Sequence, residues 1–257
     1  MNAHPGIAYY PALKKTEAGE REKINNEPII EEVPVTIFLN GQEITTLLAL
    51  KGEEEFLAAG FLASAGIISK ASEISGLKTD TGVVQVTVKN PGAKIPLNYY
   101  LSLAKEQAKL TPGDTGRQDK IPSLTLTTNE IETYAQILEE KSKLYQVTGG
   151  AHGGCLAQAG EMKFFSFDVS RLNVFDKLYG RCLLQGIERE NKVMVFSGRV
   201  SAEIVLKLYK MGLSVIIARS APTSLALDLA VKFGITIIAF ARGARFNVYT
   251  HEERVLF

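Results

Sequence analysis

The stretch VMVFSGRVSAEIVLKLYKMGLSVIIARSAPTSLALDLAVKFGITIIAF, residues 193 to 240, decides the fold of this chain. It holds three short apolar runs with the length of buried strands: VMVF (193–196), SVIIA (214–218) and ITIIAF (235–240). The two segments between these runs carry apolar residues at helical spacing and end at Gly212 and Gly234, as helices commonly do. Strands that alternate with helices across short connections predict a parallel sheet with right-handed crossovers. We therefore expect a parallel β-α-β-α-β unit over residues 193–249, in a chain of the α/β class.

Three polar loops follow the predicted strands. In parallel β-α units the carboxyl ends of the strands share one edge of the sheet, and ligands of open α/β sheets bind outside that edge. The loops would bring hydroxyl groups, small residues and arginines together there: Ser197, Gly198, Arg199, Arg219, Ser220, Arg242, Gly243, Ala244 and Arg245. Two of the loops also open helices, whose first N–H groups are unpaired and carry partial positive charge. This combination of donors predicts a phosphate or pyrophosphate site.

A purely structural explanation of the same residues is also open. Arg199 or Arg219 could pair with Glu203 or Asp228 on the following helices, and the hydroxyl residues that open those helices could be plain N-caps. The chain has 29 basic and 28 acidic side chains and a net charge of +1, so an anion site has to be local. Arginines gathered at one edge favour the anion site, but their spacing does not identify the anion.

A second candidate is the glycine-rich stretch TGGAHGGC (148–155). Its glycines, among them Gly149 and Gly150, could let the backbone approach a ligand closely, and His152 could face that ligand. A glycine-rich turn with a hydrogen-bonded histidine is an equally open interpretation. The chain has no P-loop, no GxGxxG after a strand, no CxxC pair, no HExxH and no GxSxG. Nucleotide, zinc and serine-hydrolase sites of those kinds are therefore not expected, and we expect no bound metal.

The remaining sequence predicts one domain over residues 28–257, preceded over residues 1–27 by a loosely ordered tail or a loosely docked arm. VPVTIFL (33–39), followed by Asn-Gly, is typical of a β-hairpin. A helix that begins with a capping box is expected over about 128–145. The polar segment KEQAKLTPGDTGRQDKIP (105–122) predicts a long mobile loop, and loops of this length are often functional.

Cellular location and broad class follow from composition. No apolar run approaches the ~18 residues of a membrane span, and the N-terminus lacks the apolar core of a signal peptide. Two cysteines, Cys155 and Cys182, do not make a disulfide framework. We therefore expect a cytoplasmic protein that binds neither a membrane nor nucleic acid.

Several of these segments resemble the formate dehydrogenase accessory proteins of the FdhD family. They are EFLAAGFLASAGII, TGGAHGG, SGRVSAEIVLK, SAPTSLALDLA and FGITIIAFARGARFNVYTH. The resemblance extends from about Glu27 to His251, and its C-terminal block is the most specific part. It implies an α/β fold similar to cytidine deaminases, a three-layer sandwich with a mixed sheet, usually as a homodimer. The H-x-E and P-C-x-x-C patterns of zinc deaminases are absent here, so deaminase activity is not expected.

The resemblance also implies a role in the maturation of molybdenum-dependent formate dehydrogenase. In the family a loop cysteine takes sulfur from a cysteine desulfurase as a persulfide. The sulfur passes to Mo-bis(molybdopterin guanine dinucleotide), or Mo-bisMGD, before this cofactor enters the catalytic subunit of the dehydrogenase. The cofactor-binding stretch of the family matches a short run here: Phe240, Ala241, Arg242, Gly243, Ala244 and Arg245. The arginines would hold cofactor phosphates, and a nucleotide such as GDP would mimic one end of the cofactor.

Two motifs of the family are not matched. The loop that should carry a CGxC-like motif, KEQAKLTPGDTGRQDKI (105–121), has no cysteine, and a persulfide needs a thiolate. Where the family often has Gly-Arg-His-Asn, this chain has Ser170-Arg171-Leu172-Asn173. The histidine of that motif is missing, whereas Arg171 and Asn173 match.

Three functions stay open at this point. The first is a sulfurtransferase-type maturation factor, for which Cys155 would be the sulfur carrier, although buried free cysteines are common. The second is a chaperone that binds Mo-bisMGD or a guanine nucleotide without transferring sulfur. The third is a metal-dependent nucleotide-processing enzyme. Because the arginine loops match the family and the loop nucleophile is missing, the sequence supports cofactor binding better than catalysis.

Overall fold

The computed structural model describes residues 6–90, 92 and 124–257, and their strands form four sheets. The expected loop over 105–122 lies outside the described residues. In the part of the chain that is described, no helix is long and apolar enough to cross a membrane.

The largest sheet has the strand order β13-β12-β11-β10-β8-β9. Its strands are β8 (His152–Gln158), β9 (Glu161–Asp168), β10 (Val193–Phe196), β11 (Val215–Ala218), β12 (Thr236–Arg242) and β13 (Arg245–Val248). β10, β11 and β12 pair in parallel, whereas β8, β9 and β13 pair antiparallel with their neighbours, so the sheet is mixed. β10 and β11 are continuous apolar runs because both of their faces are buried.

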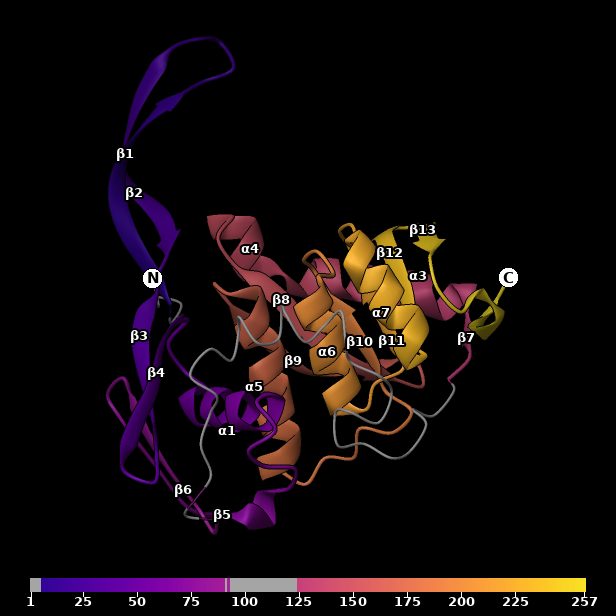
Figure 1. Cartoon of the computed structure of the whole chain (residues 1–257). Coiled ribbons are helices and arrows are strands. Elements are labelled where there is room, and N and C mark those ends of the chain that lie inside the picture. Colours follow the sequence, from indigo (N-terminus) through magenta and orange to yellow (C-terminus); the bar gives the residue numbers. More distant parts are fainter. Residues whose placement is uncertain (1–5, 91, 93–123) are drawn as a thin grey trace.

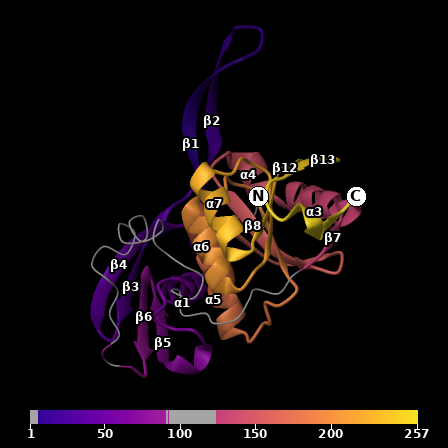
Figure 2. The ribbon, with the colours of Figure 1, turned by 45° about the vertical axis from the view of Figure 1, so that its right-hand side comes forward.

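Helices cover both faces of this sheet (Figures 1 and 2). One face carries α3 (Thr128–Lys141), and the other carries α5 (Arg171–Leu184), α6 (Ala202–Met211) and α7 (Ser224–Phe233). Alternate residues of β10 enter different cores: Val195 packs in the cluster of α3, and Phe196 in the cluster of α5, α6 and α7. α6 and α7 end at Gly212 and Gly234, both in the left-handed conformation. The β-α-β-α-β run thus positions three strand ends along one edge.

A smaller sheet, in the order β4-β3-β6-β5, packs beside the large one. It consists of β3 (Val33–Leu39), β4 (Gln42–Ala49), β5 (Ile74–Asp80) and β6 (Val83–Val88). The expected hairpin is β3–β4, whose turn residues Asn40 and Gly41 both have positive φ. α1 (Glu54–Ser64) joins this sheet to α5. Gly60 and Gly180 sit where the two helices cross, and a Cβ on either would overlap the backbone of the other helix.

Residues 7–30 form a hairpin, where the sequence predicted a loosely ordered tail or a loosely docked arm over residues 1–27; the correction is that this segment has regular strands. β1 (Ile7–Lys15) and β2 (Arg21–Ile30) form an antiparallel hairpin, here called the arm, that extends from the body (Figure 1). Ile7 and Ile30 anchor its base in a small core with Leu50. Beyond the base most side chains of both strands are exposed. Strands that are exposed on both faces need no apolar alternation, and the sequence of this segment has none.

The helix expected over 128–145 is two helices. α3 begins at the expected capping box of Thr127 and Glu130, and α4 (Lys143–Thr148) follows it. Ser142 separates them, and its hydroxyl donates to the carbonyl of Leu138 at 2.6 Å. Such a bond to the preceding turn competes with the helical pattern and changes the direction of the chain. The short elements η1 (Ala71–Glu73), β7 (Leu126–Thr127), η2 (Glu252–Arg254) and β14 (Val255–Leu256) complete the described structure.

Candidate functional site: an arginine-lined cleft

A cleft of about 500 Å³ opens at the edge where β10, β11 and β12 end. The beginnings of β8 and α5 and the helix α4 complete its wall. Its lining residues are Ser142, Tyr145, Ala151, His152, Arg171, Ser197, Gly198, Arg199, Arg219, Ser220 and Arg242. A volume of this size lies within the range of small-molecule sites. The structure thus brings the loop residues 197–199, 219–220 and 242 to one place, together with His152.

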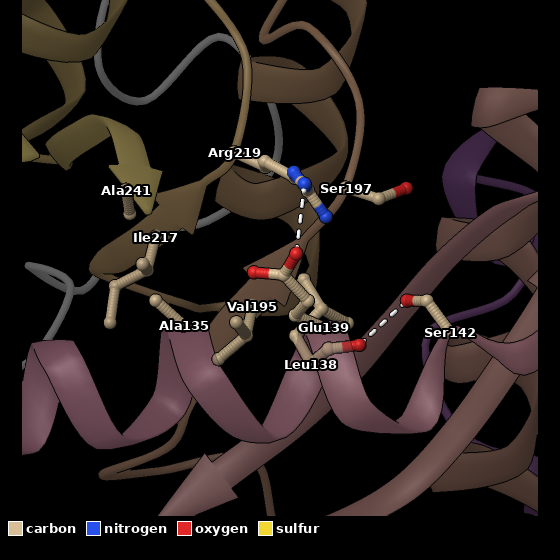
Figure 3. A pocket seen from close by; sticks show the side chains of 9 residues that line it. All are labelled: Ala135, Leu138, Glu139, Ser142, Val195, Ser197, Ile217, Arg219 and Ala241. Atoms are coloured by element: carbon tan, nitrogen blue, oxygen red, sulfur yellow. Dashed lines mark hydrogen bonds and ion pairs between the residues drawn. The ribbon is translucent and has the colours of Figure 1, made fainter. Parts of the chain in front are cut away.

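Four arginines line the cleft, and they differ in their partners. Arg219 forms an ion pair with Glu139 of α3, with 3.1 Å between Nη2 and Oε1 (Figure 3). Both side chains of this pair are partly exposed, so the pair holds Arg219 only weakly. Among the described residues, no carboxylate lies within ion-pair distance of Arg171, Arg199 or Arg242. The partner of Arg219 is therefore neither Glu203 nor Asp228, and three guanidinium groups remain available to an anion.

A small pocket between α3 and the sheet adjoins the cleft and shares Ser142, Ser197 and Arg219 with it (Figure 3). Its apolar lining, here called the floor, consists of Ala135 and Leu138 of α3 and Val195, Ile217 and Ala241 of the sheet. The space in this pocket is about 10 Å³, which is about the size of one water molecule. It leaves no room for a larger group between α3 and the sheet.

Serine hydroxyls fix the loops that carry the arginines. Ser197 Oγ accepts from the backbone N–H of Gly153 at 2.9 Å, which joins the loop after β10 to β8. Ser220 Oγ donates to the Ser197 carbonyl at 3.1 Å, which joins the loops after β10 and β11. Because Ser197 Oγ accepts in its bond with Gly153, its own hydrogen remains available to a ligand. The pair thus orders two of the loops around Arg199 and Arg219.

His152 is the first residue of β8 and is half-buried at the rim of the cleft. Burial lowers the pKa of its imidazole, and the positive charges of Arg171 and Arg199 lower it further. Asp168, which pairs with His152 in the β8–β9 ladder, acts in the opposite direction. A lowered pKa means that His152 is mainly neutral at pH 7 and can take up a proton when negative charge enters the cleft.

Glycines permit the close packing around this histidine. A Cβ on Gly198 would lie 2.7 Å from the Phe196 ring and 3.2 Å from Nδ1 of His152. Gly153 and Gly154, which the glycine-rich interpretation placed in a turn, belong to β8. A Cβ on Gly153 would meet the Phe167 ring at 2.7 Å. These glycines thus serve close approach of protein to protein, and the strand begins directly at His152.

Several predicted site residues lie outside the cleft. Within the stretch 240–245, Arg242 lines the cleft and Ala241 belongs to its floor. The others form the exposed end of the β12–β13 hairpin: Phe240, Gly243, Ala244 and Arg245. Gly149 ends α4 with φ 67° and Gly150 packs against Ile30 at the base of the arm; neither is a lining residue.

The cleft also contains residues that were not predicted from the loops after the strands, chiefly Arg171 and Tyr145. Arg171 is the first residue of α5, and its only signal was the match to the family in Ser170-Arg171-Leu172-Asn173. Tyr145 is the last residue of the helix expected over about 128–145. The break at Ser142 places it instead in α4, where 49% of its surface is exposed and it lines the cleft.

Cys155, the candidate sulfur carrier, is enclosed in the protein. It is 0% exposed, lies in the middle of β8 and packs in the core under α3. Burial raises the pKa of its thiol well above the usual value. Cys182 is buried in α5, and burial raises its pKa to about 11. A sulfur carrier needs an accessible thiolate, and the environment of both cysteines is the opposite of that.

The described residues contain no group of three or more His, Cys, Asp and Glu side chains that could hold a metal ion. The chemistry of the cleft is instead that of an anion site. Guanidinium groups, a serine hydroxyl and a neutral histidine surround an opening with an apolar floor and one exposed aromatic ring. Such a set recognises phosphate groups together with a flat ring system.

Comparisons with known proteins agree on one family. Residues 30–256 match the model of the FdhD/NarQ family. The chain is 37% identical over 238 residues to the sulfur carrier protein FdhD of Geobacillus kaustophilus, with 90% of each chain covered. It is 34% identical to the sulfur carrier protein FdhD of Bacillus subtilis, with 93% of this chain and 94% of that protein covered.

A solved structure is similar over the whole chain. It is the crystal structure of a formate dehydrogenase accessory protein from Desulfotalea psychrophila, with a TM-score of 0.82 and 29% sequence identity. The match covers 98% of this chain and 100% of that one. The family model, the curated relatives and this structure together lead to one conclusion: the chain belongs to the FdhD/NarQ family, the family of FdhD sulfur carrier and formate dehydrogenase accessory proteins.

Proposed function

We propose that this protein binds Mo-bisMGD during the maturation of a molybdenum-dependent formate dehydrogenase, and that the arginine-lined cleft holds one guanine nucleotide end of the cofactor. The observation that carries the proposal is the convergence of Arg171, Arg199 and Arg242, three arginines without a carboxylate partner among the described residues, on one cleft. Guanidinium groups bind phosphate oxygens in pairs, with defined geometry.

The residues present fit such a group. The arginines and Ser197 would hold the phosphates, and Tyr145 offers a half-exposed ring on which a base could stack. A cleft of about 500 Å³ suits one nucleotide end of the cofactor, so the rest of it would extend into solvent or toward a partner. When bound, the cofactor supplies the molybdenum centre; the chain itself supplies charge neutralisation and orientation.

Sulfur transfer is the second candidate, and the names of the relatives favour it. Against it stand the sequence of the segment 105–121, which has no cysteine, and the burial of Cys155 and Cys182. We therefore propose a chaperone that binds the cofactor and does not carry sulfur on its own cysteines.

The partners in this proposal follow from the family. A cysteine desulfurase would act on the bound cofactor, and the catalytic subunit of formate dehydrogenase would receive it. A homodimer, a cytidine deaminase-like arrangement of the large sheet and a cytoplasmic location belong to the same proposal. The two cysteines support the cytoplasmic location, because both are free and a reducing compartment keeps thiols free.

Calorimetric titration of the full chain with GDP and with guanosine tests the binding proposal. GDP should bind, guanosine should bind at least about tenfold more weakly because it lacks phosphates, and added salt should weaken GDP binding. Arg199→Ala should weaken GDP binding by about tenfold. Arg21→Ala, which removes the same charge from the exposed arm, should leave it unchanged. Equal affinity for GDP and guanosine, or no affinity for either, would overturn the proposal.

A persulfide assay decides between the two candidates. The protein is incubated with a cysteine desulfurase and cysteine, and its intact mass is measured without reductant. We expect no added sulfur on wild type or on Cys155→Ser. One added sulfur atom on wild type that is absent from Cys155→Ser would establish sulfur transfer and contradict the chaperone proposal.

A further inference from the structure

Two buried aspartate–lysine pairs hold α5, and they lie in different surroundings. Asp168 pairs with Lys177, with 2.7 Å between Oδ2 and Nζ, and Asp176 pairs with Lys207 at 2.5 Å. All four side chains are almost fully buried. Burying charges is costly, and replacement of such pairs by apolar residues is often neutral for stability. The presence of a buried pair is therefore not explained by stability alone.

The carboxylate of Asp168 uses its full capacity as an acceptor. Oδ1 accepts from the backbone N–H of Ser170 and from Nδ2 of Asn173, both at 2.9 Å. Oδ2 accepts from the N–H of Leu50 at 3.2 Å, in addition to its bond with Lys177. In the other pair, Oδ2 of Asp176 has no hydrogen-bond partner within the part of the chain that the structure describes.

The two groups bound by Asp168 Oδ1 flank Arg171, a lining residue of the cleft. Arg171 begins α5, and its N-cap residue Ser170 makes no capping bond with its own side chain. Asp168 holds the N–H of Ser170 on one side of Arg171, and the amide of Asn173 on the other. Asn173 is fixed further by a bond to the Leu48 carbonyl at 2.9 Å. The backbone at Arg171 is therefore set by Asp168.

We infer that Asp168 is a positioning residue of the cleft: it fixes the beginning of α5 so that Arg171 faces the same anion as Arg199 and Arg242. Lys177 neutralises the carboxylate and binds the Leu50 carbonyl at 3.0 Å, so that the lysine is satisfied as well. The inference rests on the proposed anion-binding function and adds to it a buried residue that acts through Arg171.

The pair of Asp176 and Lys207 provides a matched control. It likewise has one member in α5, Asp176, and is also a buried aspartate–lysine pair. It bonds to Ser64 of α1, however, and none of these residues lines the cleft. The double variants Asp168→Ala/Lys177→Met and Asp176→Ala/Lys207→Met each remove one buried ion pair without leaving a lone charge. If the role of Asp168 is only structural, both variants should behave alike toward a ligand.

The experiment measures GDP affinity by calorimetry and stability by urea unfolding, on wild type and both variants. We expect Asp168→Ala/Lys177→Met to bind GDP about tenfold more weakly, because Arg171 is no longer fixed toward the phosphate. The control should bind within about twofold of wild type even where it is the less stable variant. Asp168→Asn/Lys177→Met keeps an oxygen for Ser170 and Asn173 and should recover most of the affinity.

Three results would overturn the inference. Wild-type affinity in Asp168→Ala/Lys177→Met, or an equal loss in the control, would overturn it while the anion site stands. Absence of GDP binding by wild type would overturn the proposed function together with it. Should the double variant not fold, Asn173→Leu removes one anchor without changing charge, and an unchanged affinity there would contradict the inference in the same way.

Discussion

His152 and Cys155 lie at the two ends of the sequence HGGC in β8, but their surroundings differ. His152 is at the rim of the arginine-lined cleft, whereas Cys155 is enclosed in the core under α3. Both are titratable, and burial favours the neutral form of each. It lowers the pKa of the imidazole and raises the pKa of the thiol.

This difference shows which chemistry the fold makes available. On the cleft side, arginines, a neutral histidine and a serine hydroxyl meet at strand ends that a ligand can reach. On the core side, the thiol has no exposed surface, and no cation among the described residues favours its thiolate. The same strand thus contributes His152 to the proposed anion site and keeps the thiol of Cys155 out of it.

Charge reversal in the cleft should give the largest effect. Arg199→Glu/Arg242→Glu replaces two donors of charge-assisted hydrogen bonds by groups that repel phosphate. We expect GDP affinity to fall by about a thousandfold or more in calorimetry, since each such bond contributes about 1.5–3 kcal/mol.

The control for this experiment is Arg245→Glu, which changes the charge of the exposed β12–β13 turn outside the cleft. It should weaken GDP binding by about threefold at most, through long-range repulsion that salt removes. An equally large loss in Arg245→Glu would place the anion along the turn 240–245 and not in the cleft.

Much of the cleft could be predicted because its loops follow local patterns. The strands ending at Phe196, Ala218 and Arg242 are apolar runs, and the helices between them end at glycines with positive φ. Period and capping are properties of short segments, so the sequence contains them directly. Once the strands are parallel, the meeting of Arg199, Arg219 and Arg242 follows from topology.

The missed parts depend on contacts between distant segments. Arg171 reaches the cleft because β8 and β9 add to the large sheet beside β10, a pairing that no local pattern specifies. Gly153 and Gly154 have low strand propensity, yet they belong to β8 because it pairs with β9 and β10, and Phe167 and Met194 leave no room there for a Cβ. The two strands of the arm were missed because strands exposed on both sides carry no apolar alternation.

The reactivity of the thiols tests the burial of Cys155 and Cys182 and should give the next largest effect. We expect both cysteines of the folded protein to react with an aromatic disulfide reagent at pH 8 at least about a hundredfold more slowly than in the unfolded chain. For Cys182 a pKa of about 11, against 9.0 for a free thiol, already lowers the thiolate fraction by this factor. Cys155→Ser and Cys182→Ser assign the rates. A fast thiol in the folded protein that is lost in Cys155→Ser would contradict its enclosure.

The protonation of His152 should give the smallest effect, and it tests whether the anion binds at the rim of the cleft beside this residue. Burial and the charges of Arg171 and Arg199 lower its pKa, whereas Asp168 opposes them, so NMR titration should find it below 6.5 in the free protein. A bound phosphate adds negative charge and should raise this pKa, and by linkage binding then strengthens as pH falls through the raised value. Sulfate, which does not titrate in this range, is the probe, and its affinity should be about threefold higher at pH 5.5 than at pH 8. His152→Gln should remove this dependence. An imidazole pKa that sulfate leaves unchanged would show that the anion does not bind beside His152.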